Sequence, residues 1–115
     1  MLTTVGKAFL ADQITQAGDS PMSHMAVGTG ATAEALGDTT LQTEAGRVAL
    51  TSKTSTGNVA NFVATFPAGT GTGTITEMGI LNAASGGKLL LRKTFGAITK
   101  TAGTSLTLTM SLTQS

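Results

Sequence analysis

The sequence predicts a mainly β protein: an antiparallel β-sandwich or partly closed barrel with one short N-terminal α-helix. Threonine occurs 23 times and glycine 15 times among the 115 residues. Threonine favours strands because its branched side chain restricts χ1, and glycine supplies tight turns. Candidate strands follow at intervals of 8 to 15 residues, which is typical of a sandwich or barrel and not of alternating strands and helices. We expect one domain over residues 1–115, with the helix in 1–18 and the β-domain in 22–115.

The N-terminal segment has the pattern of an amphipathic helix. Apolar side chains recur along it at helical spacing, at Val5, Phe9 and Ile14. Either Thr3 or Thr4 can cap its first turn. Two interpretations of the apolar stripe stay open. The stripe closes one end of its own β-domain, or it packs on a neighbouring subunit, in which case these three side chains contact the partner.

The rest of the chain contains six candidate strands, over residues 22–28, 47–54, 59–66, 74–81, 88–95 and 105–113. In the last of them leucine and methionine alternate with serine and threonine, which predicts one buried and one solvent-facing side. Phe62, Ala64 and Phe66 share a face by the same period of two. Between the first two strands, Asp38 is expected to cap a single helical turn through Glu44.

The charge pattern argues against several classes of partner. Seven basic and six acidic residues give a net charge of +1, so no basic patch is expected to bind nucleic acid and none to anchor the chain to a membrane. The basic residues of the C-terminal half, among them Arg92, Lys93 and Lys100, are interpreted as a solvated face. No apolar run is long enough for a membrane helix, and no secretory signal precedes the helix, so we expect synthesis in the cytoplasm.

No pattern of catalytic, metal or cofactor residues is present, and the expectation is a protein without enzymatic activity. The chain has no cysteine and a single histidine, His24, whereas a metal site needs three or four converging ligands. No serine lies in a nucleophile elbow. The glycine–threonine run at 69–74 resembles a phosphate loop but lacks its lysine, and a strand follows it where a helix is needed.

Glu77 is the polar residue that the sequence singles out. It lies in an otherwise apolar strand and is the only formal charge between Lys53 and Lys88. A buried carboxylate needs a partner, and the only arginines are Arg47 and Arg92. We expect an ion pair between Glu77 and one of these arginines. The alternative is that Glu77 lies on the solvent-exposed face of its strand.

Several short motifs occur in a recognisable order: MAVGTG at 25–30, LQTE at 41–44, FPAG at 66–69, ITEMGI at 75–80 and NAASGG at 82–87. In this order the chain resembles the N-terminal, baseplate-attachment domain of phage tail-collar and tail-fibre proteins. It also resembles small stand-alone structural proteins of phage virions. The resemblance covers nearly the whole chain, and the block at 75–87 is its most specific part.

The resemblance implies a non-enzymatic structural protein of a tailed-bacteriophage virion. In such fibres this domain is the anchor, while receptor recognition lies in C-terminal repeats; the chain ends at Ser115, so we expect an attachment or adaptor component of the tail fibre or baseplate. The alternative is a capsid decoration (cement) protein on the head shell. A carbohydrate-binding module is less favoured because the chain has no Trp or Tyr to stack on a sugar.

The same resemblance implies the partners. They are other virion proteins, either of the baseplate and tail or the major capsid protein, and the protein is expected to be located in the virion. The small number of charges also predicts self-association, because an uncharged surface is easily covered by another subunit, and a trimer is the expected state.

Overall fold

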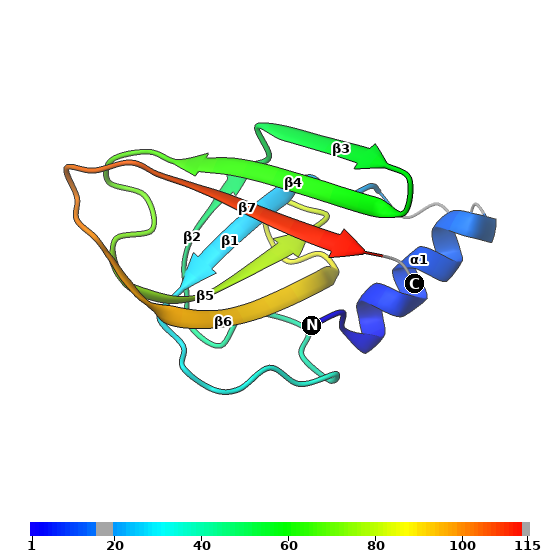
Figure 1. Ribbon diagram of the computed structural model, residues 1–115. Coiled ribbons are helices and arrows are strands. Elements are labelled where there is room, and N and C mark those ends of the chain that lie inside the picture. Colours follow the sequence, from blue (N-terminus) through cyan, green and yellow to red (C-terminus); the bar gives the residue numbers. More distant parts are fainter. Residues whose placement is uncertain (16–19, 114–115) are drawn as a thin grey trace.

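The computed structural model describes residues 1–15 and 20–113, without the side chains of residues 12–15. One helix, α1 (Thr4–Thr15), precedes seven strands: β1 (His24–Gly28), β2 (Glu44–Ala49), β3 (Ser52–Thr56), β4 (Val59–Phe66), β5 (Gly73–Leu81), β6 (Leu89–Lys100) and β7 (Leu106–Thr113). They form two antiparallel sheets, in the orders β2-β1-β5-β6 and β3-β4-β7, which pack together with α1 at one end (Figure 1). The predicted fold class is confirmed.

The main core lies between the two sheets. The three-stranded sheet buries Phe62, Ala64, Phe66 and Met110, and the facing sheet buries Met25, Val27, Ile75, Met78 and Ile80. The two predicted strand faces are confirmed, because the inward side chains of β4 and β7 are buried or half-buried while Thr107 and Thr109 are exposed. Each large side chain that is fully buried stabilises the fold by about 1.5–3 kcal/mol.

The predicted single strand over residues 47–54 is wrong. The chain crosses from one sheet to the other at this point, so β2 and β3 are separate strands of different sheets. The Leu50 amide donates to the Ser23 carbonyl (2.9 Å), and the Thr51 amide donates to the Val63 carbonyl (2.7 Å). These two consecutive bonds reach neighbours in different parts of the sandwich. Strand β6 also continues beyond the predicted end at residue 95, to Lys100.

Helix α1 packs on its own β-domain. Its first turn is capped by Thr3, whose Oγ1 accepts a hydrogen bond from the Gly6 amide (2.9 Å). A Cβ on Gly6 would lie 2.5 Å from the Leu90 carbonyl oxygen, so the glycine allows the helix to lie directly against β6. Phe9 is 4% exposed and belongs to the main core.

For Phe9, these contacts support the interpretation in which the apolar stripe packs on its own domain. The helix closes one end of its own domain, and Phe9 is not available to a partner because its ring is already buried within the chain. Val5 is half-buried. The side chain of Ile14, the third predicted contact, lies outside the described residues.

A long loop, residues 29–43, crosses the outer face of the four-stranded sheet. Its Leu41 covers Ala26, Leu81 and Leu89, which form a second, smaller apolar cluster with it on that face. The predicted helical turn after Asp38 is wrong: the loop contains no helix, and the Asp38 carboxylate accepts hydrogen bonds from the Ala35 amide and from an arginine side chain of β6.

Candidate functional site

The Glu77 carboxylate lies between β5 and the 29–43 loop and accepts four hydrogen bonds. The side chain has no exposed surface. Its Oε2 accepts hydrogen bonds from the amides of Gly30 (2.9 Å) and Thr43 (2.8 Å), and its Oε1 accepts from the Gln42 amide (2.8 Å) and from Arg92 Nε (3.0 Å). One carboxylate therefore binds both ends of the loop.

Glycines make room for this carboxylate. A Cβ on Gly28 would lie 2.6 Å from Glu77 Oε2, and a Cβ on Gly30 would lie 2.5 Å from the same atom. Both distances are far inside van der Waals contact, so any other residue would displace the carboxylate or the loop. Thr76, which neighbours Glu77 on β5, also donates from its Oγ1 to the Gly30 carbonyl (2.7 Å). The first turn of the loop is thus held by β5 from two adjacent residues.

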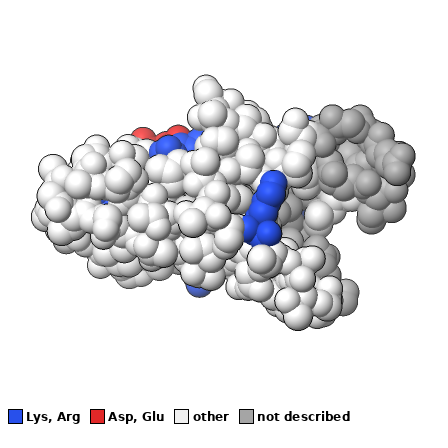
Figure 2. Space-filling model, turned by 90° about the horizontal axis from the view of Figure 1, so that it is seen from above, with Lys and Arg blue, Asp and Glu red and all other residues white. Residues whose placement is uncertain are grey.

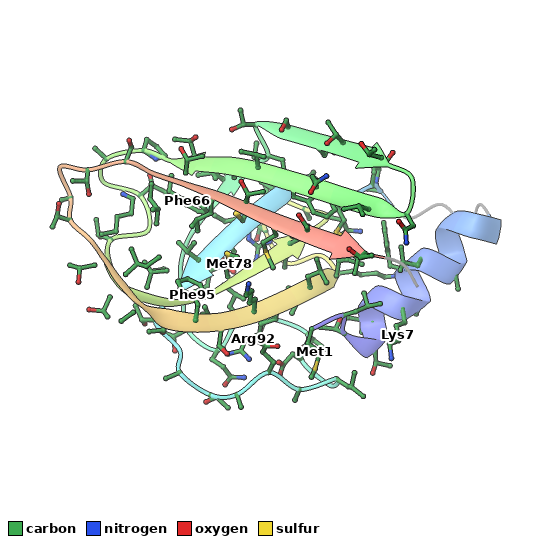
Figure 3. All side chains as sticks on the ribbon, in the orientation of Figure 1. Met1, Lys7, Phe66, Met78, Arg92 and Phe95 are labelled. Atoms are coloured by element: carbon green, nitrogen blue, oxygen red, sulfur yellow. The ribbon has the colours of Figure 1, made fainter. Side chains whose placement is uncertain are left out.

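The Arg92 side chain holds the middle of the loop. It has no exposed surface, and it points away from the inter-sheet core, where Phe66 and Met78 lie, toward the loop (Figure 3). Besides the bond to Glu77, its Nη1 donates to Asp38 Oδ2 (3.1 Å) and its Nη2 to the Thr32 carbonyl (2.9 Å). All three nitrogens are bonded, as a buried guanidinium requires.

A third carboxylate fixes the loop to the outer edge of β6. Glu34 Oε1 accepts from the Thr94 amide (2.8 Å) and from Thr94 Oγ1 (3.2 Å), and Glu34 Oε2 lies 3.4 Å from the amino group of Met1. The Thr94 amide holds the pKa of Glu34 below its ordinary value, against the opposing effect of burial and with help from the amino group.

The pKa of Glu77 is also below its ordinary value. Burial alone would raise it, but the amides of Thr43 and Gln42, followed by Arg92 and Gly30, stabilise the charged form more strongly. The carboxylate is therefore ionised at neutral pH. Its contacts with the loop and with Arg92 are charge-assisted, which makes them stronger than bonds between neutral groups.

Arg92 and not Arg47 is the partner of Glu77. Arg47 binds Glu44, with its Nη2 at 2.7 Å and its Nε at 3.1 Å from the two carboxylate oxygens. Its Nη1 donates to the carbonyls of Ala83 and Gly86, each at 2.9 Å, so it holds the turn between β5 and β6. The solvent-facing alternative for Glu77 is wrong because the loop covers it completely.

The interpretation of the C-terminal basic residues as a solvated face is wrong for two of them. Arg92 is buried as described, and Lys100 is 2% exposed, with its Nζ donating to the carbonyls of Pro67 and Thr104, each at 2.9 Å. Lys93 is exposed. The loop ligands of Glu77 were missed because backbone amides carry no residue signature; only the glycines before and after Thr29 hinted at a close approach.

Glu77 and Arg92 bind the 29–43 loop to the four-stranded sheet. Among the described side chains no buried nitrogen or oxygen lacks a hydrogen-bond partner. The described residues contain no group of three or more His, Cys, Asp or Glu that could hold a metal ion. Their one helix is too short to cross a membrane.

Two open hollows on the described surface are lined almost entirely by apolar side chains. One, of about 270 Å³, lies where α1 meets the end of the sandwich, between Phe9, Phe62 and Leu112. The other, of about 190 Å³, lies between β6 and β7 and is lined by Phe95, Ile98 and Leu108 among others. Neither brings together the several polar groups that fix the orientation of a small ligand.

Comparison of the chain with protein-family models gives no match, and comparison with curated proteins gives none either.

Proposed function

We propose that this chain is a non-enzymatic structural protein of a tailed-bacteriophage particle, an attachment or adaptor component of the tail fibre or baseplate. One observation supports the proposal above others. The motifs that carry the resemblance, at residues 25–30, 41–44 and 75–80, meet at the Glu77 carboxylate. Short matches that arise by chance have no reason to converge on one buried group. Their convergence favours a single inherited structural device.

The surface supports the same proposal. Seen from above, over the three-stranded sheet, the molecule presents few charged side chains: one basic side chain stands out on this face, and a small group of basic and acidic side chains lies near its edge (Figure 2). The outward positions of β7 are Thr107, Thr109, Ser111 and Thr113, all exposed. Depletion of charge is a feature of the surfaces that proteins bury against one another. A neutral face of small hydroxyl side chains suits contact with another subunit better than recognition of a charged ligand.

The polar groups of the interior serve the scaffold. Arg47, Lys100 and the pair of Glu77 with Arg92 each donate to or accept from backbone groups of turns and loops. A subunit that holds its loops in this way presents fixed surfaces to its neighbours. In the proposed role those neighbours are other baseplate or tail proteins and further copies of the chain; in the decoration alternative the neighbour is the major capsid protein.

Gold-labelled antibody against the purified chain, applied to intact particles from cells that produce it, tests the proposal. Label at the tail or its tip is the expected result. Label over the head would replace the attachment role with capsid decoration while keeping the virion assignment. Particles that purify without the chain and without label would overturn the proposal.

A further inference from the structure

The two sheets leave four strand edges, and three of them are protected against pairing with another chain. Strand β2 carries Glu44 and Arg47, and β3 is only five residues long and carries Lys53. The outer side of β6 is covered in part by the first three residues, through a bridge between Leu2 and Leu91. Charges, short length and covering segments are the devices by which natural edge strands avoid association.

Strand β7 has none of these devices. Its eight residues include no charge and no proline. Its register with β4 runs without a shift from Thr113 opposite Val59 to Leu106 opposite Phe66. No strand of the described chain lies on its other side (Figure 1). An edge strand leaves one row of its backbone amides and carbonyls without ladder partners on that side. A long, regular and uncharged edge of this kind is a template for one more strand.

The sequence of β7 matches itself in reverse. Around Thr109 as centre, Leu108 corresponds to Met110 and Leu106 to Leu112, and the hydroxyl residues correspond in the same way. If two copies pair antiparallel about a twofold axis at Thr109, these residues become cross-strand neighbours. Side chains then stay on matching faces, apolar inward and hydroxyl outward, and no like charges oppose each other. The self-complementary pattern therefore favours a second copy of the chain as the added strand.

An apolar hollow lies where such a strand would be added. It is the hollow of about 190 Å³ between β6 and β7, lined by Phe95, Ile98 and Leu108 among others. Ile98 is 36% exposed, which makes it one of the few large apolar side chains that the described chain leaves to solvent. In Figure 3, Phe95 lies along β6 on the side that faces β7. The inward-facing leucines of an added strand would cover this hollow, so pairing would remove apolar surface from water as well as satisfy backbone groups.

We infer that two copies of this chain associate through β7, antiparallel about a twofold axis at Thr109, and join their three-stranded sheets into one continuous sheet. The contact is isologous, with the same strand on both copies. It goes beyond the proposed function and does not depend on it. It also replaces the expected trimer, because the uncharged edge is complementary to itself and the opposite edge of the same sheet is short and carries a lysine.

Light scattering of the purified full-length chain tests the inference, together with a variant that carries three lysines on the outward positions of β7: Thr107→Lys, Thr109→Lys and Ser111→Lys. The native chain should have twice the chain mass of 11.5 kDa. In the variant each lysine would face another lysine across the axis, and dissociation should become easier by at least about tenfold. A matched control places three lysines on exposed positions of β3, at Ser52, Thr54 and Thr56, on the same face of the same sheet. This control should remain dimeric.

A mixing experiment separates loss of pairing from loss of folding. A second β7 variant carries glutamate at the same three positions, and alone it should likewise dissociate more easily than the native chain. An equal mixture of the lysine and glutamate variants should recover the dimer, because opposite charges then face each other. A native monomer throughout the micromolar range, a trimer, or a dimer unchanged by the β7 lysines would each overturn the inference. Failure of antibody labelling on particles would overturn the proposed function alone.

Discussion

Replacing Glu77 by glutamine tests the central structural device of the protein. Glutamine keeps the shape of the side chain, but one of its two terminal atoms becomes an NH₂ group that cannot accept a hydrogen bond. Each carboxylate oxygen accepts two bonds, so in either orientation two donors lose their acceptor. At about 1–3 kcal/mol for each buried donor left unpaired, the two together cost about 2–6 kcal/mol. Breaking a buried ion pair typically costs about 3–5 kcal/mol, which agrees with this figure.

Urea unfolding followed by far-ultraviolet circular dichroism measures the effect, since the chain has no Trp or Tyr to report by fluorescence. The matched control is Glu44→Gln, which removes a carboxylate that pairs with Arg47 at a partly exposed position. Such pairs contribute about 1 kcal/mol or less. A difference of less than about 1 kcal/mol between the two variants would refute the buried-clamp reasoning.

A double-mutant cycle identifies the partner of Glu77. Combining Glu77→Gln with Arg92→Gln should give a coupling energy well above about 0.5 kcal/mol, because the two side chains share a direct bond. The same cycle with Arg47→Gln should give no coupling beyond error. Coupling to Arg47 and none to Arg92 would contradict the observed pairing.

Three further outcomes follow from the packing and the charges. Met110→Ala, at a position 6% exposed, should cost about 2–4 kcal/mol in unfolding free energy, whereas Thr109→Ala on the exposed face of the same strand should cost about 0.5 kcal/mol or less. Gly6→Ala should lower the melting temperature although alanine is the better helix former, because the new Cβ would meet the Leu90 carbonyl. Its control is Gly96→Ala, where a Cβ meets nothing within 4 Å. A stabilised Gly6→Ala protein would contradict the close approach of the helix to β6. Folding lowers the pKa of Glu77 and of Glu34, so their contribution to stability is full above the unfolded carboxyl pKa of about 4.3 and is lost as the pH falls below that value. The unfolding free energy, measured from neutral to acid pH, should therefore drop below about pH 4.3. The drop should be less steep in Glu77→Gln, which lacks one of the two carboxylates.

Local sequence patterns were sufficient to predict the fold class and several faces. The alternation in β7 and the three-residue period-two face of β4 placed the right side chains in the core, because a strand with one buried side repeats every two residues. The break between β2 and β3 could not be seen in this way. Residues 47–54 form an unbroken strand-like run, and only pairing with distant segments decides that the chain changes sheet at Leu50.

The candidate site was predictable in part. A lone carboxylate in an apolar strand requires a cation, and two arginines were available, so the pair could be foreseen but not which arginine forms it. The register of the strands decides which arginine pairs with Glu77. Gly28 of β1 and Thr94 of β6 lie opposite Glu77, and Arg92 lies on β6 two residues before Thr94. The loop amides that bind the carboxylate could not be foreseen, since their position depends on a 15-residue connection that has no repeating pattern of its own.

The loop over the outer face is bonded in a way that links its motions to those of the whole domain. Its amides at Gly30, Gln42 and Thr43 point at a carboxylate on a central strand, and Arg92 reaches it from the next strand. Opening the loop would uncover a charged pair as well as the apolar cluster beneath it, so partial opening is costly. These three amides should exchange with solvent deuterium as slowly as strand amides, although they lie outside any strand's ladder. The loop and the sheet would then form one cooperative unit, with no independently opening flap.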